Sequence, residues 1–309
     1  MTALPTLLER APGSLGEFAG RDELWLKRED LSELGMFKWR AALPVVQELA
    51  RDGREAVVTA STGSHGAAVA WACRQLAKRA VVFTPPGVTP PKLALMESLG
   101  ADLRVAGRDL DEAKDAGRAW ARDEQLPFFE DGAEPLQYQA YRAIGEEILD
   151  QMPVMPCAVV IPIGNGALAG GVAAALGRRA PAVVRVGVVA DSMPVMAESY
   201  EAGEPVSAPF GETIADGLAV RVAIPLAVER LHEALDGLIR VSERALAQAL
   251  VACHEAGVAV EPSAAAAVAA VRVQPDLMGD GPLVLVMTGR NVDPAVLERA
   301  RRDPGSFDN

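Results

Sequence analysis

One lysine of this sequence stands between aromatic residues, an arrangement that suits reactive amine chemistry. Only five of the 30 basic residues are lysines, and Lys38 lies between Phe37 and Trp39. Burial against aromatic rings disfavours the charged form of an amine, and the neutral nitrogen can then attack an aldehyde. The ordinary alternative is a lysine whose alkyl stem rests on an apolar patch, and Lys38 taken alone favours that alternative. The other four lysines have polar neighbours, as solvated charges do: Lys27, Lys78, Lys92 and Lys114.

Two glycine-bearing loops have the residues needed to bind an anion. Residues 61–66 read Ser-Thr-Gly-Ser-His-Gly, and residues 164–167 read Gly-Asn-Gly-Ala. Each loop follows a short apolar run and precedes an alanine-rich stretch, which predicts a position at the N-terminus of a helix. Backbone N–H groups and hydroxyls at such a terminus can bind a carboxylate or a phosphate. Simple helix caps look similar, so each loop by itself is a weak signal.

The elements that must position these groups are short β-branched runs alternating with helical stretches. The runs occupy residues 56–60, 80–83, 158–161, 186–189 and 283–287. Strands that alternate with helices are typical of the α/β class. Nearly continuous apolar strands are covered on both faces, so we expect mostly parallel sheets. Such sheets bind ligands beyond the carboxyl ends of their strands, which is where both loops lie.

Several further segments have a clear pattern. The charged segment 109–125 predicts a solvated amphipathic helix, and the alanines at 264–267 predict a tightly packed one. The uncharged stretch 151–177 contains three prolines and a Gly-Asn-Gly centre, so it predicts a strand, a loop and a helix rather than a membrane span.

The overall composition excludes several classes of function. A formal net charge of −12 leaves no basic surface for nucleic acid or anionic lipid. Cys73, Cys157 and Cys253 are too few and too far apart for a disulfide framework or paired zinc ligands, which favours a reducing cytoplasm. No residues have metal-ligand spacing, so we assign no metal. The first residues lack a basic region followed by an apolar run, so we expect no signal peptide.

Taken together and in this order, the motifs resemble the fold type II pyridoxal-phosphate enzymes. This group holds serine and threonine dehydratases, serine racemase, threonine synthase, cysteine synthase and the tryptophan synthase β subunit. The blocks that carry the resemblance are residues 26–30 with 37–40, 61–66, 99–101, 164–166, 213–218, 261–263 and 288–291. Thr-Ile-Ala-Asp-Gly at 213–217 and Glu-Pro-Ser at 261–263 favour the dehydratase branch.

The resemblance implies an architecture of two open, mostly parallel twisted sheets flanked by helices, with a smaller domain inserted in a larger one and the cofactor in the cleft. Residues 1–41 would form an N-terminal arm and the start of the large domain, including the Schiff-base lysine. Residues 42–129 would form the small domain that binds the substrate carboxylate, and residues 130–309 the large domain that binds the cofactor.

The resemblance also implies a role for each motif. Lys38 would bind pyridoxal 5'-phosphate as a Schiff base and act as the base at the substrate Cα, and Thr62 is the second catalytic candidate. The implied cofactor-binding residues are Phe37, Lys38, Ser64, Gly164, Asn165, Gly166, Ala167, Leu168 and Thr288. The residues implied to hold the substrate carboxylate are Ser61, Thr62, Gly63 and His65. A neutral Thr288 hydroxyl at the pyridine nitrogen favours prompt expulsion of a β-leaving group.

Five positions depart from the family pattern. Ser64 stands where the family usually has asparagine, and Asn165 and Ala167 interrupt a run of glycines. Ala143 replaces a threonine, and Arg290 replaces a glycine. An inward-facing Arg142 or Arg290 would suit a substrate with a second anion, and a surface arginine is the alternative.

The expected activity is β-elimination from a hydroxy amino acid such as serine, threonine or hydroxyaspartate, giving a 2-oxo acid and ammonia. A second hypothesis is β- or γ-replacement, as in cysteine synthase or threonine synthase, which the Gly-Asn-Gly loop favours. Racemisation is a lesser alternative, because the racemases of the group carry serine at the position of Thr62. A third hypothesis is a cofactor-binding protein with impaired catalysis, which the altered loops would explain. We expect a cytoplasmic homodimer whose partner is a small amino acid, without nucleic acid or membrane.

Overall fold

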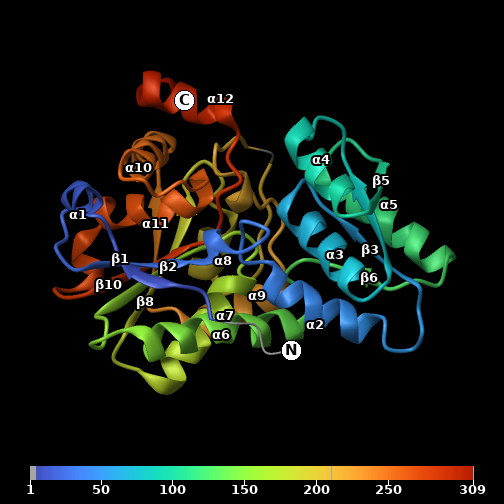
Figure 1. Ribbon diagram of the computed structural model, residues 1–309, viewed down its shortest axis with the longest axis horizontal. Helices are drawn as coiled ribbons and strands as arrows, with labels where there is room; N and C mark the ends of the chain where they lie inside the picture. Colours follow the sequence, from blue (N-terminus) through green and yellow to red (C-terminus); the bar gives the residue numbers. More distant parts are fainter. Residues whose placement is uncertain (1–4, 210, 309) are drawn as a thin grey trace. The chain divides into compact units, whose positions relative to one another are not determined.

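The computed structural model describes residues 5–209 and 211–308, which form two compact units (Figure 1). The large unit contains residues 1–37 and 141–309, and the small unit contains residues 38–140. Each unit has its own mostly parallel sheet with flanking helices, so the predicted α/β class is confirmed. The sequence placed the inserted domain at residues 42–129, whereas Lys38 and helix α2 (Trp39–Leu49) belong to the small unit because α2 packs against α3 (Ser64–Gln75).

The sheet of the large unit has six strands in the order β1-β2-β10-β7-β8-β9. All neighbouring strands are parallel except β1 and β2, which run antiparallel. The strands are β1 (Leu8–Arg10), β2 (Leu24–Arg28), β7 (Ala158–Pro162), β8 (Val184–Ala190), β9 (Gly237–Val241) and β10 (Leu283–Met287). The helices are α1 (Gly13–Ala19), α7 (Ala167–Arg179), α8 (Val195–Ala202), α9 (Pro225–Ala234), α10 (Glu243–Glu255), α11 (Pro262–Val273) and α12 (Pro294–Arg302).

Helix α11 lies at the centre of the large unit's core. Its residues from Pro262 to Val271 are all buried, as the alanine run predicted. It packs across β7, β8, β9 and β10 and also against α10. Alanine side chains permit this because they let a helix approach a sheet and a second helix closely.

The sheet of the small unit has four parallel strands in the order β5-β4-β3-β6. The strands are β3 (Ala56–Ala60), β4 (Arg79–Thr84), β5 (Ala101–Val105) and β6 (Phe128–Phe129). The helices are α2, α3, α4 (Pro90–Ser98) and α5 (Leu110–Asp123), and α6 (Pro135–Gln151) begins in this unit. The Asp109 side chain caps α5 by accepting from the Glu112 N–H at 2.9 Å. No helix within residues 5–209 or 211–308 has the length and apolar character needed to cross a bilayer.

Lys27 is fully buried in the large unit, so the prediction of a solvated charge was wrong. Its Nζ donates to Glu147 Oε2 of α6 at 2.6 Å and to the Thr6 carbonyl at 2.8 Å. The polar neighbours that suggested solvation, Glu29 and Asp30, are themselves buried. The ion pair therefore ties β2, the segment before β1 and α6 together.

Replacing Glu147 with glutamine should lower the free energy of unfolding by roughly 3 kcal/mol, because it removes the carboxylate that balances a buried ammonium. Urea denaturation followed by circular dichroism measures the change. The matched control is Glu146→Gln, whose ion pair with Arg178 at 2.7 Å is largely solvent-exposed and should contribute less than about 1 kcal/mol. Equal losses in the two variants would contradict the expectation.

Candidate active site

The predicted site residues fall into two groups, one in each unit. In the small unit, β3 and β6 are parallel neighbours with Thr59 opposite Phe129. The chain leaves both strands at the carboxyl edge of the sheet, so Ser61 and Asp131 each stand two residues beyond this pair. This edge is where parallel sheets bind their ligands.

The loop after β3 opens helix α3, as predicted. Ser61 Oγ accepts from the Gly63 N–H at 3.0 Å, and α3 begins at Ser64. The first N–H groups of a helix have no carbonyl within the helix to bind, so those of α3 are directed out of its N-terminus. Gly66 permits close packing below the loop, since an added Cβ would lie 2.6 Å from Met96 Sδ. Within the loop Ser61 and His65 are buried, whereas Thr62 and Ser64 are half-buried.

Lys38 stands directly before α2, and its amine forms an ion pair that the sequence did not reveal. Its Nζ lies 2.5 Å from Asp131 Oδ2, and the side chains of Lys38 and Asp131 are 18% and 17% exposed. Gln137 of α6 donates through Nε2 to the other oxygen of Asp131 at 2.8 Å. The same amide accepts from the Gly132 N–H at 2.8 Å, which fixes the loop that carries Asp131.

Asp131 is thus the functional candidate that sequence reasoning missed. Burial opposes ionisation of its carboxyl, but the positive charge of Lys38 and hydrogen bonds from Lys38 and Gln137 hold its pKa well below the usual range. The available signal was the short apolar run Phe128–Phe129 followed by two acidic residues and a glycine. Two residues are too short a run to predict a strand with assurance.

His65 belongs to the same cluster and is held neutral. Its Nε2 lies 3.0 Å from the Thr59 hydroxyl, which itself donates to the Phe129 carbonyl at 2.8 Å. The hydroxyl proton is used in that bond, so Nε2 donates the ring proton to the hydroxyl oxygen. The other ring nitrogen, Nδ1, lies 3.6 Å from Asp131 Oδ1. Burial, reinforced by the charge of Lys38 and opposed by that of Asp131, lowers the pKa of His65 to about 4.

The stability of the protein should therefore fall as the pH drops from 6.5 to about 4, because the unfolded chain takes up a proton that folded His65 excludes. The full effect is about 3 kcal/mol at 1.36 kcal/mol per pKa unit. The pKa of Asp131 is likewise depressed by folding, so it lowers the stability in the same sense, but only below its ordinary pKa of 3.8, outside this window. Urea denaturation across the window should show a flatter pH dependence in His65→Gln than in the parent. His232→Gln, at an exposed position of α9, should keep the parent slope, and three parallel curves would contradict the assignment.

In the large unit, the glycine loop after β7 opens helix α7. Asn165 Oδ1 accepts from the Ala167 N–H at 3.1 Å, and Gly166 has a left-handed backbone with φ of +92°. A Cβ on Gly166 would also lie 3.0 Å from Leu231 Cδ1. A Cβ on Gly164 would collide with the Gly217 carbonyl oxygen. Both glycines are therefore required by the packing around the loop.

This packing brings together blocks that are far apart in the sequence. The Gly217 N–H donates to Ser263 Oγ at 3.1 Å, so the Thr-Ile-Ala-Asp-Gly and Glu-Pro-Ser motifs meet beside the glycine loop. Glu261 itself lies against Gly289, where an added Cβ would stand 2.7 Å from Glu261 Oε1. The Glu261 N–H donates to the Gly289 carbonyl at 3.0 Å, as a structural anchor would.

Thr288 follows β10, and its side-chain hydroxyl is buried but makes no hydrogen bond to the described residues. The residue is 4% exposed, and its Oγ1 is buried without a hydrogen-bond partner among the residues that the structure describes. The Thr288 carbonyl accepts from the Phe37 N–H at 3.0 Å, and the Phe37 ring packs edge-on against Tyr141 with centroids 5.1 Å apart. Burying an unsatisfied hydroxyl costs free energy, which a ligand acceptor such as a pyridine nitrogen would recover.

The residues present therefore fit pyridoxal phosphate. In the small unit, the Lys38 amine would suit the aldehyde. In the large unit, the loop at Gly164–Leu168 opens a long helix whose N–H groups would suit a phosphate, and Thr288 has a hydroxyl that is unsatisfied among the described residues. Among the described residues there is no cluster of His, Cys, Asp and Glu that could bind a metal ion.

The two arginines considered for a second anion lie at the surface. Arg290 is exposed, and its guanidinium donates to the Asp30 carbonyl. Arg142 is exposed on α6. The surface alternative is thus the one observed.

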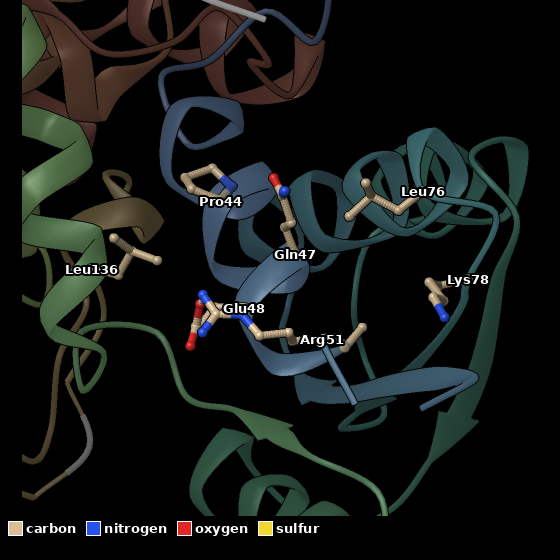
Figure 2. A pocket seen from close by; sticks show the side chains of 8 residues that line it. Pro44, Gln47, Glu48, Arg51, Leu76, Lys78 and Leu136 are labelled. Carbon is tan, nitrogen blue, oxygen red and sulfur yellow. Dashed lines mark hydrogen bonds and ion pairs between the residues drawn. The ribbon is translucent and has the colours of Figure 1, made fainter. Parts of the chain in front are cut away.

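The small unit also has a surface hollow, which the predicted site residues do not line. Figure 2 shows its side chains, which come from α2 and the residues just after it, from the turn that follows α3 and from the start of α6. They belong to Pro44, Gln47, Glu48, Ala50, Arg51, Leu76, Lys78 and Leu136. Glu48 and Arg51 form an ion pair with each other, and none of these eight residues is a buried charge.

Comparisons with known proteins agree with these features. The family model described as "Pyridoxal-phosphate dependent enzyme" matches residues 2–289. An L-threonine ammonia-lyase from Thermotoga maritima is 31% identical over 287 residues, which cover 92% of this chain and 71% of that protein. One from Geobacter sulfurreducens is 31% identical over 274 residues, which cover 87% and 67%.

Solved structures give the same result. The processed form of threonine deaminase isoform 2 from Solanum lycopersicum matches with a TM-score of 0.89 at 28% identity, over 97% of this chain and 88% of that one. A second threonine deaminase, from T.th., matches with a TM-score of 0.87 at 29% identity, over 94% of each chain. Because the family model covers nearly the whole sequence, the chain belongs to the pyridoxal-phosphate-dependent enzymes of fold type II, in the branch of the serine and threonine dehydratases.

Proposed function

We propose that the protein is an ammonia-lyase that eliminates the β-hydroxyl of a hydroxy amino acid. Water leaves in the elimination and is taken up again in hydrolysis, so the net products are a 2-oxo acid and ammonia. The observation that carries the proposal is the buried Thr288 hydroxyl, which is unsatisfied among the described residues. A neutral hydroxyl at the pyridine nitrogen, instead of a carboxylate, leaves that nitrogen largely unprotonated, which favours β-elimination over transamination.

Pyridoxal phosphate, when bound, withdraws electrons from the Cα of the amino acid and so makes the Cα proton removable. Lys38 would hold the cofactor through its amine, and the freed amine would take the Cα proton as a general base. Thr288 and Phe37 would hold the ring. The loop at Gly164–Leu168 would hold the phosphate, aided by the dipole of α7.

The small unit binds the amino acid itself. The loop at Ser61–His65 holds the α-carboxylate with N–H groups at the N-terminus of α3 and with its hydroxyls. Ser64 is shorter than the asparagine usual in the family, so its contact to the cofactor oxygen is weaker or made through water. Thr62 keeps a hydroxyl at the position where a second-face base acts in racemases.

The test is a substrate panel of L-serine, L-threonine and threo-3-hydroxyaspartate with the purified, cofactor-loaded protein. The curated relatives named above are L-threonine ammonia-lyases, which makes threonine the first substrate to try. Ammonia and the 2-oxo acid should appear in equal amounts. Turnover of any of these substrates also excludes a catalytically impaired protein, and no product from any of them would refute the proposal.

A replacement reaction is the second candidate, because the Asn165 side chain occupies the Ala167 N–H in the proposed phosphate loop. This loop differs from the glycine run of the dehydratases. The test supplies O-acetylserine or phosphohomoserine with thiol and amine acceptors. Formation of an adduct or of threonine supports replacement, and only 2-oxo acid as product removes it.

We also propose a cytoplasmic homodimer. Cys73, Cys157 and Cys253 are free thiols, and burial raises the pKa of Cys73 and Cys253 to about 12, as suits structural cysteines in a reducing compartment. Light scattering coupled to size exclusion tests the assembly: twice the chain mass of 32.5 kDa is expected.

A further inference from the structure

We propose that Asp131 makes the enzyme selective against substrates whose side chain is negatively charged. The inference rests on the proposed function, in which the loop at Ser61–His65 holds the α-carboxylate and Lys38 acts at Cα. Asp131 Oδ2 lies 2.5 Å from Lys38 Nζ, and its Oδ1 lies 3.6 Å from His65 Nδ1. The carboxylate is therefore close both to the reacting centre and to the carboxylate-binding loop.

Asp131 is ionised in the ion pair that it forms with Lys38. Its carboxyl is half-buried, and Lys38 and Gln137 each donate to one of its oxygens. Burial alone would raise its pKa, but these partners hold the pKa well below the usual range. A substrate side chain therefore meets an ionised carboxylate.

Lys38 does not cancel this charge during the reaction. A general base must be unprotonated before it can take a proton, so Lys38 is neutral when it acts at Cα. His65 is neutral as well, with its pKa lowered to about 4 by burial. Gln137 still donates to Asp131 Oδ1 when Lys38 is neutral, so the carboxylate keeps a hydrogen-bond donor that favours its ionised form. At that stage the cluster of Lys38, His65 and Asp131 has a net negative charge.

Two other lysines stand near the loop, and neither is available to a second anion. The alkyl chain of Lys92 packs over Gly63, where an added Cβ would lie 3.0 Å from Lys92 Cδ, so we assign its charge to the α-carboxylate proposed to bind at this loop. Lys114 lies 3.7 Å from the carboxylate of Asp111. A β-hydroxyl, in contrast, can donate a hydrogen bond to Asp131. The charges therefore favour threonine over hydroxyaspartate, which has a carboxylate in place of the methyl group.

The experiment compares the binding of L-asparagine and L-aspartate to the cofactor-loaded protein by calorimetry. The two amino acids have nearly the same shape, differ in side-chain charge and lack a β-hydroxyl to eliminate. Asparagine should bind about tenfold more tightly or better, since like charges in close contact are costly. In Asp131→Asn the ratio of the two affinities should fall to about one. If Asp131 had only a structural role, its replacement would lower the affinity for both amino acids and leave the ratio of the two affinities unchanged.

Two further variants complete the design. Glu130→Gln removes the neighbouring carboxylate, which lies 2.5 Å from Arg118, and should keep the parent ratio. Asp131→Glu keeps the charge and should keep the discrimination, so the proposal stays testable if Asp131→Asn does not fold. Binding of aspartate as tightly as asparagine by the parent protein, or binding of neither, would overturn the proposal.

The outcome is separable from that of the proposed function. If serine or threonine yields 2-oxo acid while aspartate and asparagine bind equally, the elimination stands and the role of Asp131 fails. If no substrate yields 2-oxo acid but the affinity ratio depends on Asp131, the charge selectivity stands and the proposed reaction fails.

Discussion

Replacing Lys38 with alanine should lower kcat for 2-oxo acid formation by about 10³-fold or more and remove the visible absorbance of the protein-bound cofactor. A positioned general base contributes about 10²–10⁴ in rate, and the same side chain is proposed to hold the cofactor covalently. Both readouts are needed because they separate the two proposed roles of Lys38, attachment of the cofactor and proton transfer at Cα. Absorbance spectra before and after desalting report attachment, and a coupled assay for ammonia reports turnover.

The matched control is Lys78→Ala in the same unit. Lys78 lines the surface hollow of Figure 2 and has no contact with the Asp131 cluster among the described residues. Its loss should leave the spectrum and kcat within about twofold of the parent, as is usual for surface substitutions. A Lys38→Ala protein that kept its visible band through desalting and a tenth of its activity would contradict the assignment.

Lys38 could be picked out from the sequence because the cause of its unusual setting is local. Its aromatic neighbours are adjacent in the chain, and the order of the motifs around it is typical of one enzyme family. Asp131 could not, because it lies 93 positions away from Lys38. Their pairing depends on the strand order β5-β4-β3-β6, which places the short strand β6 beside β3. The sequence predicts strands well but does not state which of them are neighbours.

Burial of charge was the other feature that the sequence concealed. Lys27 lies in a run of charged residues that looked solvated, yet Lys27, Glu29 and Asp30 are all buried. The run continues from β2 into the core, where Lys27 pairs with Glu147 of α6 and Asp30 pairs with Arg28 inside the run. A local pattern of polar residues cannot distinguish a solvated segment from this buried network, because a partner such as Glu147 is distant in sequence.

In the proposed phosphate loop, the motifs could be predicted from the sequence but the contacts between them could not. Its glycines, the Thr-Ile-Ala-Asp-Gly motif and the Glu-Pro-Ser motif were all recognisable singly. Their mutual contacts were not: Gly217 packs against Gly164 and leaves no room for a side chain there, while its N–H donates to Ser263 Oγ. The glycine at 164 is thus required by a neighbouring backbone, whatever ligand the loop binds.

Replacing Gly164 with alanine should accordingly weaken cofactor binding by about tenfold to a hundredfold. The new Cβ would collide with the Gly217 carbonyl oxygen, and because a backbone atom cannot rotate away, the loop itself must shift. Forcing extra carbon into a packed site costs about 1–3 kcal/mol, and a displaced loop can no longer direct its N–H groups at a phosphate. Titration of the cofactor-free protein with pyridoxal phosphate, followed by visible absorbance, measures the affinity.

Two comparisons make this result interpretable. Gly13→Ala, at the first residue of α1 in the same unit, has nothing within 4 Å of the added Cβ and should leave the affinity unchanged. Pyridoxal without its phosphate should bind Gly164→Ala and the parent about equally, because only the phosphate depends on the loop. If both forms of the cofactor lost affinity together while the fold was retained, Gly164 would support the large unit as a whole rather than a phosphate site.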